Sequence, residues 1–305
     1  MMMPDEGSES VGFNPGEVII EHVSNSSIDH PIFELPTVLG INFSVTKHVL
    51  MLWIVAVLLF VLITWSTRKY LKQDRPIPTG FMNGLEAVVQ FIRDSIVLPN
   101  VGKKFVNTWT PLILTFFFFI VTANAFGLIP MFEVLGVVDR FILHTDPESI
   151  LNRMLHGGAT ATGNYNVTAA LALITFLAII VAGTKAHGFI QHWKNVVPSG
   201  LAWPVYIMLI PIELMGMLVK PFALTMRLAA NMMGGHIAIL AILSFVFIFS
   251  EMFQSVLAGV GVGLVVSLPL VVGVSALEII IVLVQAYVFS LLTAVFIGMA
   301  INVHH

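Results

Sequence analysis

Residues 220–236 read KPFALTMRLAANMMGGH and place Arg227 inside an apolar run that extends from about Leu201 to Ser250. A guanidinium keeps its proton in proteins, so burial does not neutralise it as it can neutralise a lysine. An arginine at the middle of a bilayer costs at least about 2.5–3.5 kcal/mol on insertion scales. A permanent charge at this place therefore requires either a structural partner or a function.

The composition of the whole chain is that of a membrane protein. Of its 305 residues, 57% are hydrophobic and only 10% are charged, whereas about 25% are charged in a usual soluble domain. Several apolar runs reach the ~20 residues that cross a bilayer as a helix. The chain has no cysteine, which excludes disulfides, thiolate metal sites and thiol nucleophiles. We therefore expect an all-α polytopic membrane protein.

Charged residues are unevenly distributed along the chain, and this predicts its orientation. Residues 1–46 hold seven acids and no Lys or Arg, whereas residues 66–109 hold seven bases. Basic loops stay on the cytoplasmic side of a membrane. We therefore expect an acidic extracytoplasmic tail over 1–46, followed by a first transmembrane helix over 47–66. With five spans in total, the N-terminus would lie outside and the C-terminus in the cytoplasm.

The segment 81–98 has the pattern of an amphipathic helix. Its apolar residues recur at helical spacing, and the opposite face carries Glu86, Gln90, Arg93 and Asp94. The segment is too short and too charged to span a bilayer. We predict an interfacial helix on the cytoplasmic side, ended by Pro99.

Residues 110–305 make up the remaining helical domain. We expect a second span at about 110–130 and a third at about 167–181, with an outer loop over 131–166 between them. The loop contains GGATATGNYN, whose Gly, Thr and Asn content is typical of loops, and we assign no site to it.

Two apolar runs of about 50 residues follow, at 201–250 and 252–300. Each is more than twice the length of one perpendicular span, so each forms either two spans or one long, steeply tilted helix. No basic loop follows Lys194 to mark a further cytoplasmic turn. This favours the tilted pair, and a total of five transmembrane helices.

Few ionisable residues interrupt these two runs. A structural role is sufficient for Lys220, whose long stem can snorkel to the interface, and for Glu251, which lies where the runs join. Arg227 is either bonded to helix carbonyls or lipid phosphate, or it is a fixed charge that meets a mobile anion or bars a cation path. Its distance from both ends of the run favours the second interpretation.

Helical spacing selects the neighbours of Arg227 on its own helix. Asn231 is four residues on and shares its face. Glu213 is fourteen residues back, about 40° from that face and about 21 Å toward the cytoplasm if the helix is unbroken. Pro211 and Pro221 argue against that continuity.

The last run carries Glu278 and Gln285 on one face, seven residues apart. If the two long helices are antiparallel with Gln285 level with Arg227, then His236 and Glu278 lie at nearly the same depth, on the outer side of the arginine. A paired imidazole and carboxylate can pass protons near neutral pH. We therefore expect a proton-capable pair on one side of Arg227 and a lone carboxylate, Glu213, on the other.

Several motifs resemble those of subunit a of the F-type ATP synthase membrane sector. The Arg-Leu-x-x-Asn-Met core of that family occurs in KPFALTMRLAANMMGG (220–235), and its last-helix signature in VLVQAYVFSLLTAVFIGMA (282–300). Similarity extends over most of the chain, through EHVSNSSIDHPIFELP (21–36), TANAFGLIP (122–130) and GNYNVTAALALITF (163–176). Where some members carry Glu and His, this chain carries His236 and Glu278, so the pair is exchanged.

The resemblance implies a stator subunit that translocates protons through two half-channels against a rotating ring of c subunits. Proton flow would thereby be coupled to ATP synthesis or hydrolysis. Arg227 would separate the half-channels, and Glu213 would line the inner one. The outer one would be lined by Asn231, His236, Glu278 and Gln285, and the helical domain 110–305 would form the channel.

The same resemblance implies partners and a location. The partners would be the c-ring, the peripheral-stalk b subunits, the soluble ATPase head and membrane lipid, with no nucleic acid, in a bacterial plasma (inner) membrane. The chain would not be an enzyme on its own, since it has no GxxxxGK[ST] phosphate loop. No cofactor or metal is expected. The choice between H⁺ and Na⁺ stays open, because the ion site would belong largely to the c subunit.

Two other classes of protein also use polytopic chains. A stand-alone ion-coupled transporter predicts an internal repeat and paired broken helices, and the sequence contains no such repeat. A haem-bearing or structural subunit would use histidines such as His187 and His192. These two residues are five positions apart, a spacing that is equally common for histidines in a loop.

Overall fold

The computed structural model describes residues 31–38, 41–71, 79–129, 160–195 and 203–302, together with a few single positions elsewhere. Most of the acidic tail and most of the outer loop fall outside the described residues. The expectations for these two segments therefore rest on the sequence alone.

The described residues form five helices that are long and apolar enough to cross a membrane. They are built from α2 (Lys47–Leu71), α3 (Phe81–Phe91) with η1 (Ile92–Val97) and α4 (Leu98–Leu128), α7 (Tyr165–His187), α9 (Trp203–Met252), and α10 (Val256–Val262) with η4 (Gly263–Ser267) and α11 (Leu268–Ile301). The remaining elements are short: the hairpin of β1 (Thr37–Val38) and β2 (Ile41–Asn42), the 3-10 turn η3 (Ala161–Gly163) and α8 (Phe189–Lys194). The expected all-α polytopic fold is confirmed.

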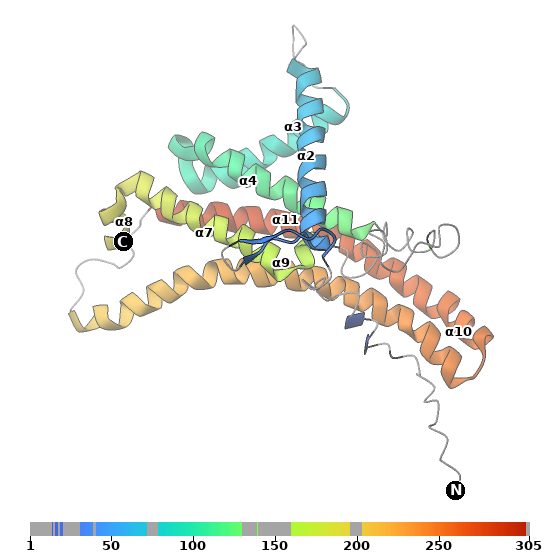
Figure 1. Ribbon diagram of the computed structural model, residues 1–305. Helices are drawn as coiled ribbons and strands as arrows, with labels where there is room; N and C mark the ends of the chain where they lie inside the picture. The colour runs from blue at the N-terminus through green and yellow to red at the C-terminus, as the bar shows by residue number, and fades with distance from the viewer. Residues whose placement is uncertain are drawn as a thin grey trace.

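The two long runs form an antiparallel pair of oblique helices. Each run is one continuous span candidate, of 50 and 46 residues, so neither is divided into two spans. A 50-residue helix is about 75 Å long at 1.5 Å per residue, far more than the ~30 Å hydrocarbon core. Figure 1 shows α9 and α11 running side by side, with α2 standing steeply across their direction. The long pair is therefore tilted in any membrane that α2 crosses.

Neither proline of α9 interrupts the helix. Pro211 and Pro221 both lie inside the continuous Trp203–Met252 element. The hydroxyl of Thr225 donates to the Pro221 carbonyl at 3.0 Å, one turn back along the same helix. Glu213 and Arg227 thus lie on one unbroken helix, which the prolines had argued against.

The helix that begins at Phe81 continues through Pro99 and breaks at Gly102. There the backbone adopts φ 76° and ψ 166°, a conformation that glycine reaches without a Cβ penalty. Pro99 directly follows the π-helix η1 and Leu98, and such local π adjustments allow a membrane helix to continue through a proline. Ile92 and Ile96 of η1 are fully buried against α4 and α11, so this segment packs on protein as well as having a polar face.

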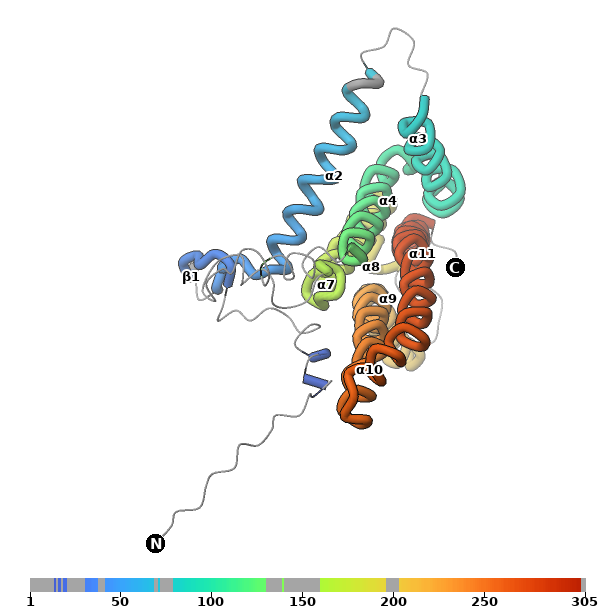
Figure 2. The backbone as a smooth tube through the Cα atoms, turned by 90° about the vertical axis from the view of Figure 1, so that its right-hand side faces the viewer, coloured from blue at the N-terminus to red at the C-terminus, as the bar shows by residue number. Residues whose placement is uncertain are grey.

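The core lies where α4, α7, α9 and α11 meet, as the nearly end-on view of Figure 2 shows. One cluster of buried residues joins Phe116 of α4 to Phe289 of α11, whose rings meet edge to face at 5.4 Å. Leu224 and Leu228 bring α9 into the same cluster. This packing fixes the rotation of α9, and with it the direction of the residues between the two leucines.

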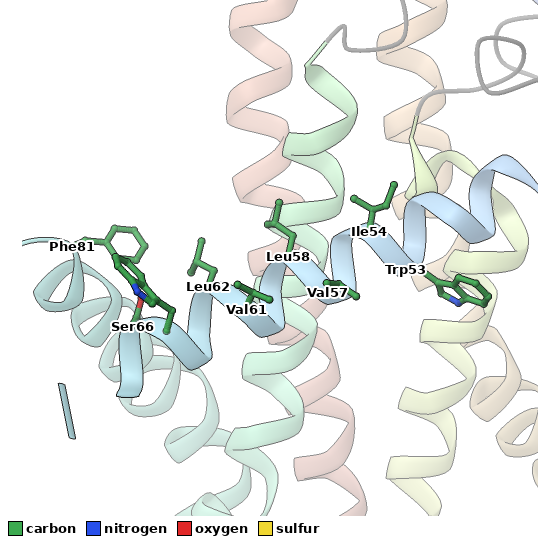
Figure 3. A pocket seen from close by; sticks show the side chains of 9 residues that line it. Trp53, Ile54, Val57, Leu58, Val61, Leu62, Ser66 and Phe81 are labelled. Carbon is green, nitrogen blue, oxygen red and sulfur yellow. The ribbon is translucent and has the colours of Figure 1, made fainter. Parts of the chain in front are cut away.

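An open apolar groove follows one side of α2 (Figure 3). Its lining consists of Trp53, Ile54, Val57, Leu58, Val61, Leu62, Trp65 and Ser66 of α2, together with Phe81 of α3. Large apolar side chains are similarly exposed along α9 and α11. Such continuous apolar surface is typical of a chain that lies in hydrocarbon or against other membrane helices.

Candidate functional site

Arg227 lies on the uncovered face of α9. It is exposed, whereas Leu224 and Leu228 on either side of it are 1% and 0% exposed. Among the described residues, its guanidinium has no hydrogen-bond or ion-pair partner. The positive charge is therefore presented outward from the described part of the chain, beside the apolar surface of the long helices.

One helical turn further along α9, Asn231 forms a hydrogen bond with α11. Its side-chain amide donates to Gln285 Oε1 at 3.0 Å, and Gln285 is only 5% exposed. Gln285 is therefore opposite Asn231 rather than level with Arg227, the register assumed from the sequence. The shift is one turn, and it arises because the antiparallel contact depends on packing between the helices.

Glu278 of α11 is packed against α9 at Gly235. Its side chain is 6% exposed, and a Cβ at position 235 would overlap with Glu278 Oε1. A glycine at this place therefore admits the carboxylate between the two helices. Because Gly235 precedes His236, Glu278 and His236 lie at nearly the same level of the helix pair.

His236 also contacts the turn that precedes α7. Its Nε2 is 2.8 Å from Thr160 Oγ1, and Thr160 is the residue that caps η3. Two residues on, Thr162 Oγ1 donates to Asn124 Oδ1 of α4 at 2.5 Å. The turn thus connects α4 with α9 through two side-chain hydrogen bonds.

This turn differs from the ordinary loop that the Gly, Thr and Asn content of GGATATGNYN predicts. Thr160 and Thr162 are 3% and 0% exposed, which is unusual for loop threonines. Their position in the sequence is the one feature that could have indicated a structural role. The two threonines are separated by one residue and lie just before the third apolar run.

Glu213 stands apart from this group. It is half-buried on α9, fourteen residues before Arg227, which corresponds to about 21 Å along an unbroken helix. Among the described residues it has no hydrogen-bond or ion-pair partner. The polar side chains of α9 are therefore divided into two sets, with Arg227 between them.

These features define an integral membrane protein in which ionisable and amide side chains are gathered between two long antiparallel helices, beside an outward-facing cation. The model of the family described as ATP synthase A chain matches residues 49–298. The chain belongs to this family, the a subunits of ATP synthase. It is accordingly an integral protein of a bacterial membrane that takes part in ATP synthesis and proton transport.

Curated relatives agree with this assignment. The chain is 38% identical over 293 residues to "ATP synthase subunit a 2" of Chlorobium luteolum, covering 93% of this chain and 75% of that protein. It is 36% identical over 300 residues to "ATP synthase subunit a" of Pelodictyon phaeoclathratiforme, covering 93% and 76%. A third relative, "ATP synthase subunit a" of Anaeromyxobacter dehalogenans, is 35% identical over 87% of this chain and 60% of its own length.

Proposed function

We propose that this chain is the stator subunit that forms two proton half-channels against a rotating ring of c subunits. Arg227 separates the two half-channels. In this role the chain couples proton flow to ATP synthesis or hydrolysis, and it carries no catalytic site for ATP itself. The observation that carries the proposal is the exposed guanidinium of Arg227 on the open face of α9, with no partner among the described residues.

The chemistry of arginine suits it to this task. A membrane-embedded cation is unfavourable unless an anion or a polar environment meets it, and a ring carboxylate that passes Arg227 supplies such an anion. The positive charge favours the ionised form of that carboxylate, so the carboxylate releases its proton near Arg227. The same charge repels hydronium and therefore opposes direct leakage from one half-channel to the other.

The outer half-channel would use the polar groups between α9 and α11. Asn231 and Gln285 are already hydrogen bonded. One to two turns further along the pair lie His236 on α9 and Glu278 on α11. Imidazole and carboxylate groups both exchange protons under physiological conditions. A proton entering here would be handed to the ring on one side of Arg227.

The inner half-channel would use Glu213. Its separation of about 21 Å from Arg227 along α9 suits a path that opens toward the opposite membrane surface. With the basic segment 66–109 in the cytoplasm, the N-terminus lies outside, the C-terminus lies inside, and Glu213 is on the cytoplasmic side. The b subunits and the soluble ATPase head complete the assembly.

The decisive test is substitution of Arg227 in the complete complex. We expect Arg227→Ala to abolish ATP-driven proton pumping in membrane vesicles while the complex still assembles. Arg227→Lys should fail as well, because a lysine in a membrane environment can lose its proton and cannot reproduce the planar guanidinium. Pumping is measured by quenching of a pH-sensitive dye, and assembly by the subunit content of the purified complex.

Lys220 is a matched control on the same helix. Its ammonium group lies 5.5 Å from the centre of the Phe296 ring, a contact within its own chain. We expect Lys220→Met to keep most of the pumping activity. Normal pumping by an assembled Arg227→Ala complex would reject the proposed function.

A further inference from the structure

We infer that Thr160 is a positioning residue for His236, and that Gly127 provides the space that Thr160 requires. The inference rests on the proposed function, since it assigns His236 to the outer proton path. It concerns the turn η3, which is distant in sequence from both long helices.

Thr160 is held in place by the elements around it. It caps η3, and its carbonyl accepts a hydrogen bond from Gly163 N at 3.2 Å. The turn itself contacts α2, α4, α7 and α9. Asn164, directly after the turn, caps α7 by accepting from Asn166 N at 2.8 Å. A hydroxyl on such a turn has a defined position, whereas one on a free loop does not.

Gly127 of α4 makes the position of Thr160 possible. A Cβ at residue 127 would overlap with Oγ1, Cγ2 and Cβ of Thr160. All three atoms belong to a branched side chain that is 3% exposed, so it has little freedom to move aside. The glycine therefore lets Thr160 sit between α4 and α9, with its hydroxyl 2.8 Å from His236 Nε2.

A threonine hydroxyl suits a histidine that changes its protonation state. It donates to an unprotonated ring nitrogen and accepts from a protonated one, by rotation about a single bond. The contact therefore persists whichever form the imidazole adopts. Holding the ring at Nε2 restricts its orientation, so the imidazole keeps a constant place beside α11 and the turn.

The test uses Thr160→Val and Thr160→Ser in the complete complex. Valine keeps the branched shape and lacks the hydroxyl, so we expect ATP-driven proton pumping to fall about 3- to 10-fold, the factor for loss of one hydrogen bond. The pH profile of pumping should also change, because the environment of a titrating group has changed. Serine keeps the hydroxyl, and Thr160→Ser should restore both the rate and the pH profile.

Thr110→Val is the matched control, since Thr110 is also buried and, within the described part of the chain, its hydroxyl bonds only the Val106 carbonyl of its own helix. This variant should pump at close to the wild-type rate. A second route is Gly127→Ala, whose methyl group would displace Thr160 and should reproduce the pH profile of Thr160→Val in assembled complexes.

Each result has a definite meaning when Arg227→Ala is measured in parallel. If Thr160→Val pumps normally, or if Thr160→Ser is as impaired as valine, the positioning role is wrong. The proposed function still stands in that case, provided that Arg227→Ala is inactive. If Arg227→Ala pumps normally, the proposed function itself has failed.

Discussion

Within two turns of α9, apolar side chains point into the core and polar side chains point to the open side. Leu224 and Leu228 are buried in the cluster with Phe289, whereas Arg227 and Asn231 are exposed. Adjacent residues of an α-helix differ by about 100° in direction, so burying the two leucines turns the arginine and the asparagine toward the open side. The placing of the charge thus follows from the placing of its apolar neighbours.

A second residue-scale feature is His192 at the corner between α7 and α8. Its imidazole lies against Gly183, where a Cβ would overlap with the ring, and its Nε2 has no hydrogen-bond partner among the described residues. Burial lowers the pKa of His192 below its ordinary value, and the nearby His187 lowers it further. Folding therefore favours the neutral form of this imidazole.

This arrangement predicts that acidification destabilises the corner. An unfolded histidine binds a proton as the pH falls through about 6.5, while the folded His192 resists protonation, so the unfolded state gains protons first. Stability is therefore complete above that pH and declines below it. We expect His192→Phe, which keeps a ring over Gly183 and cannot titrate, to show a shallower loss of thermal stability between about pH 7.5 and 5.5.

The measurement is the unfolding temperature of the purified complex, or hydrogen exchange of the α8 amides, across that pH range. The variant and the wild type must assemble equally well. An acid-dependent loss of the same size in His192→Phe would show that another group is responsible.

At the scale of elements, α4 and α11 pack closely against each other. A Cβ at Gly298 of α11 would overlap with the backbone carbonyl of Asn100 at the start of α4. That carbonyl also accepts a hydrogen bond from the Asn302 side chain at 3.1 Å. Small residues at such crossings let membrane helices approach through their backbones.

We predict that Gly298→Ala destabilises the protein and that Gly273→Ala does not. The added methyl group at 298 meets a backbone carbonyl, which cannot move aside as a flexible side chain would, and overpacking of this kind costs about 1–3 kcal/mol. Gly273 lies on the same helix, and no described atom comes within 4 Å of the place that its Cβ would occupy. There alanine should be neutral or stabilise by up to about 1 kcal/mol through helix propensity.

Thermal unfolding of the detergent-solubilised complexes compares the two alanine variants with the wild type. Equal stability of both variants would mean that α4 and α11 separate easily at this crossing. The close contact between α4 and α11 would then contribute little to the stability of the protein.

For the whole molecule, the main feature is the amount of apolar surface left uncovered beside a charge. Many large apolar residues of α9 and α11 are exposed, and Arg227 lies on the same open side. Lipid satisfies the apolar residues, but it is a poor environment for a guanidinium at mid-membrane depth. The combination favours a protein partner that carries an anion.

We therefore expect an affinity-tagged form of this chain, extracted in mild detergent, to be purified together with a c-ring and a soluble ATPase head. Reconstituted alone in vesicles, the chain should show no ion transport, because each proposed half-channel would end inside the membrane. Substrate-coupled transport by the isolated chain would instead favour the stand-alone transporter. Mass spectrometry of the purified material and a vesicle flux assay give the two readouts.

The sequence by itself determined the membrane class, the five apolar spans and the family. These properties depend on composition, on run length and on motifs within one segment, such as Arg227 with Asn231 one turn away. The face of a helix on which a side chain lies depends only on its position along that helix. Counting residues therefore correctly identifies the side chains that share a face.

Only the tertiary structure decided which groups meet across helices. It places Gln285 opposite Asn231, 54 residues away, and Thr160 beside His236, 76 residues away. It also carries α9 through two prolines and breaks the preceding amphipathic helix at Gly102. The physical reason is that the register between helices depends on close packing of residues that are distant in sequence. In a nearly all-apolar helix, the hydrophobic pattern does not show which face packs against which neighbour.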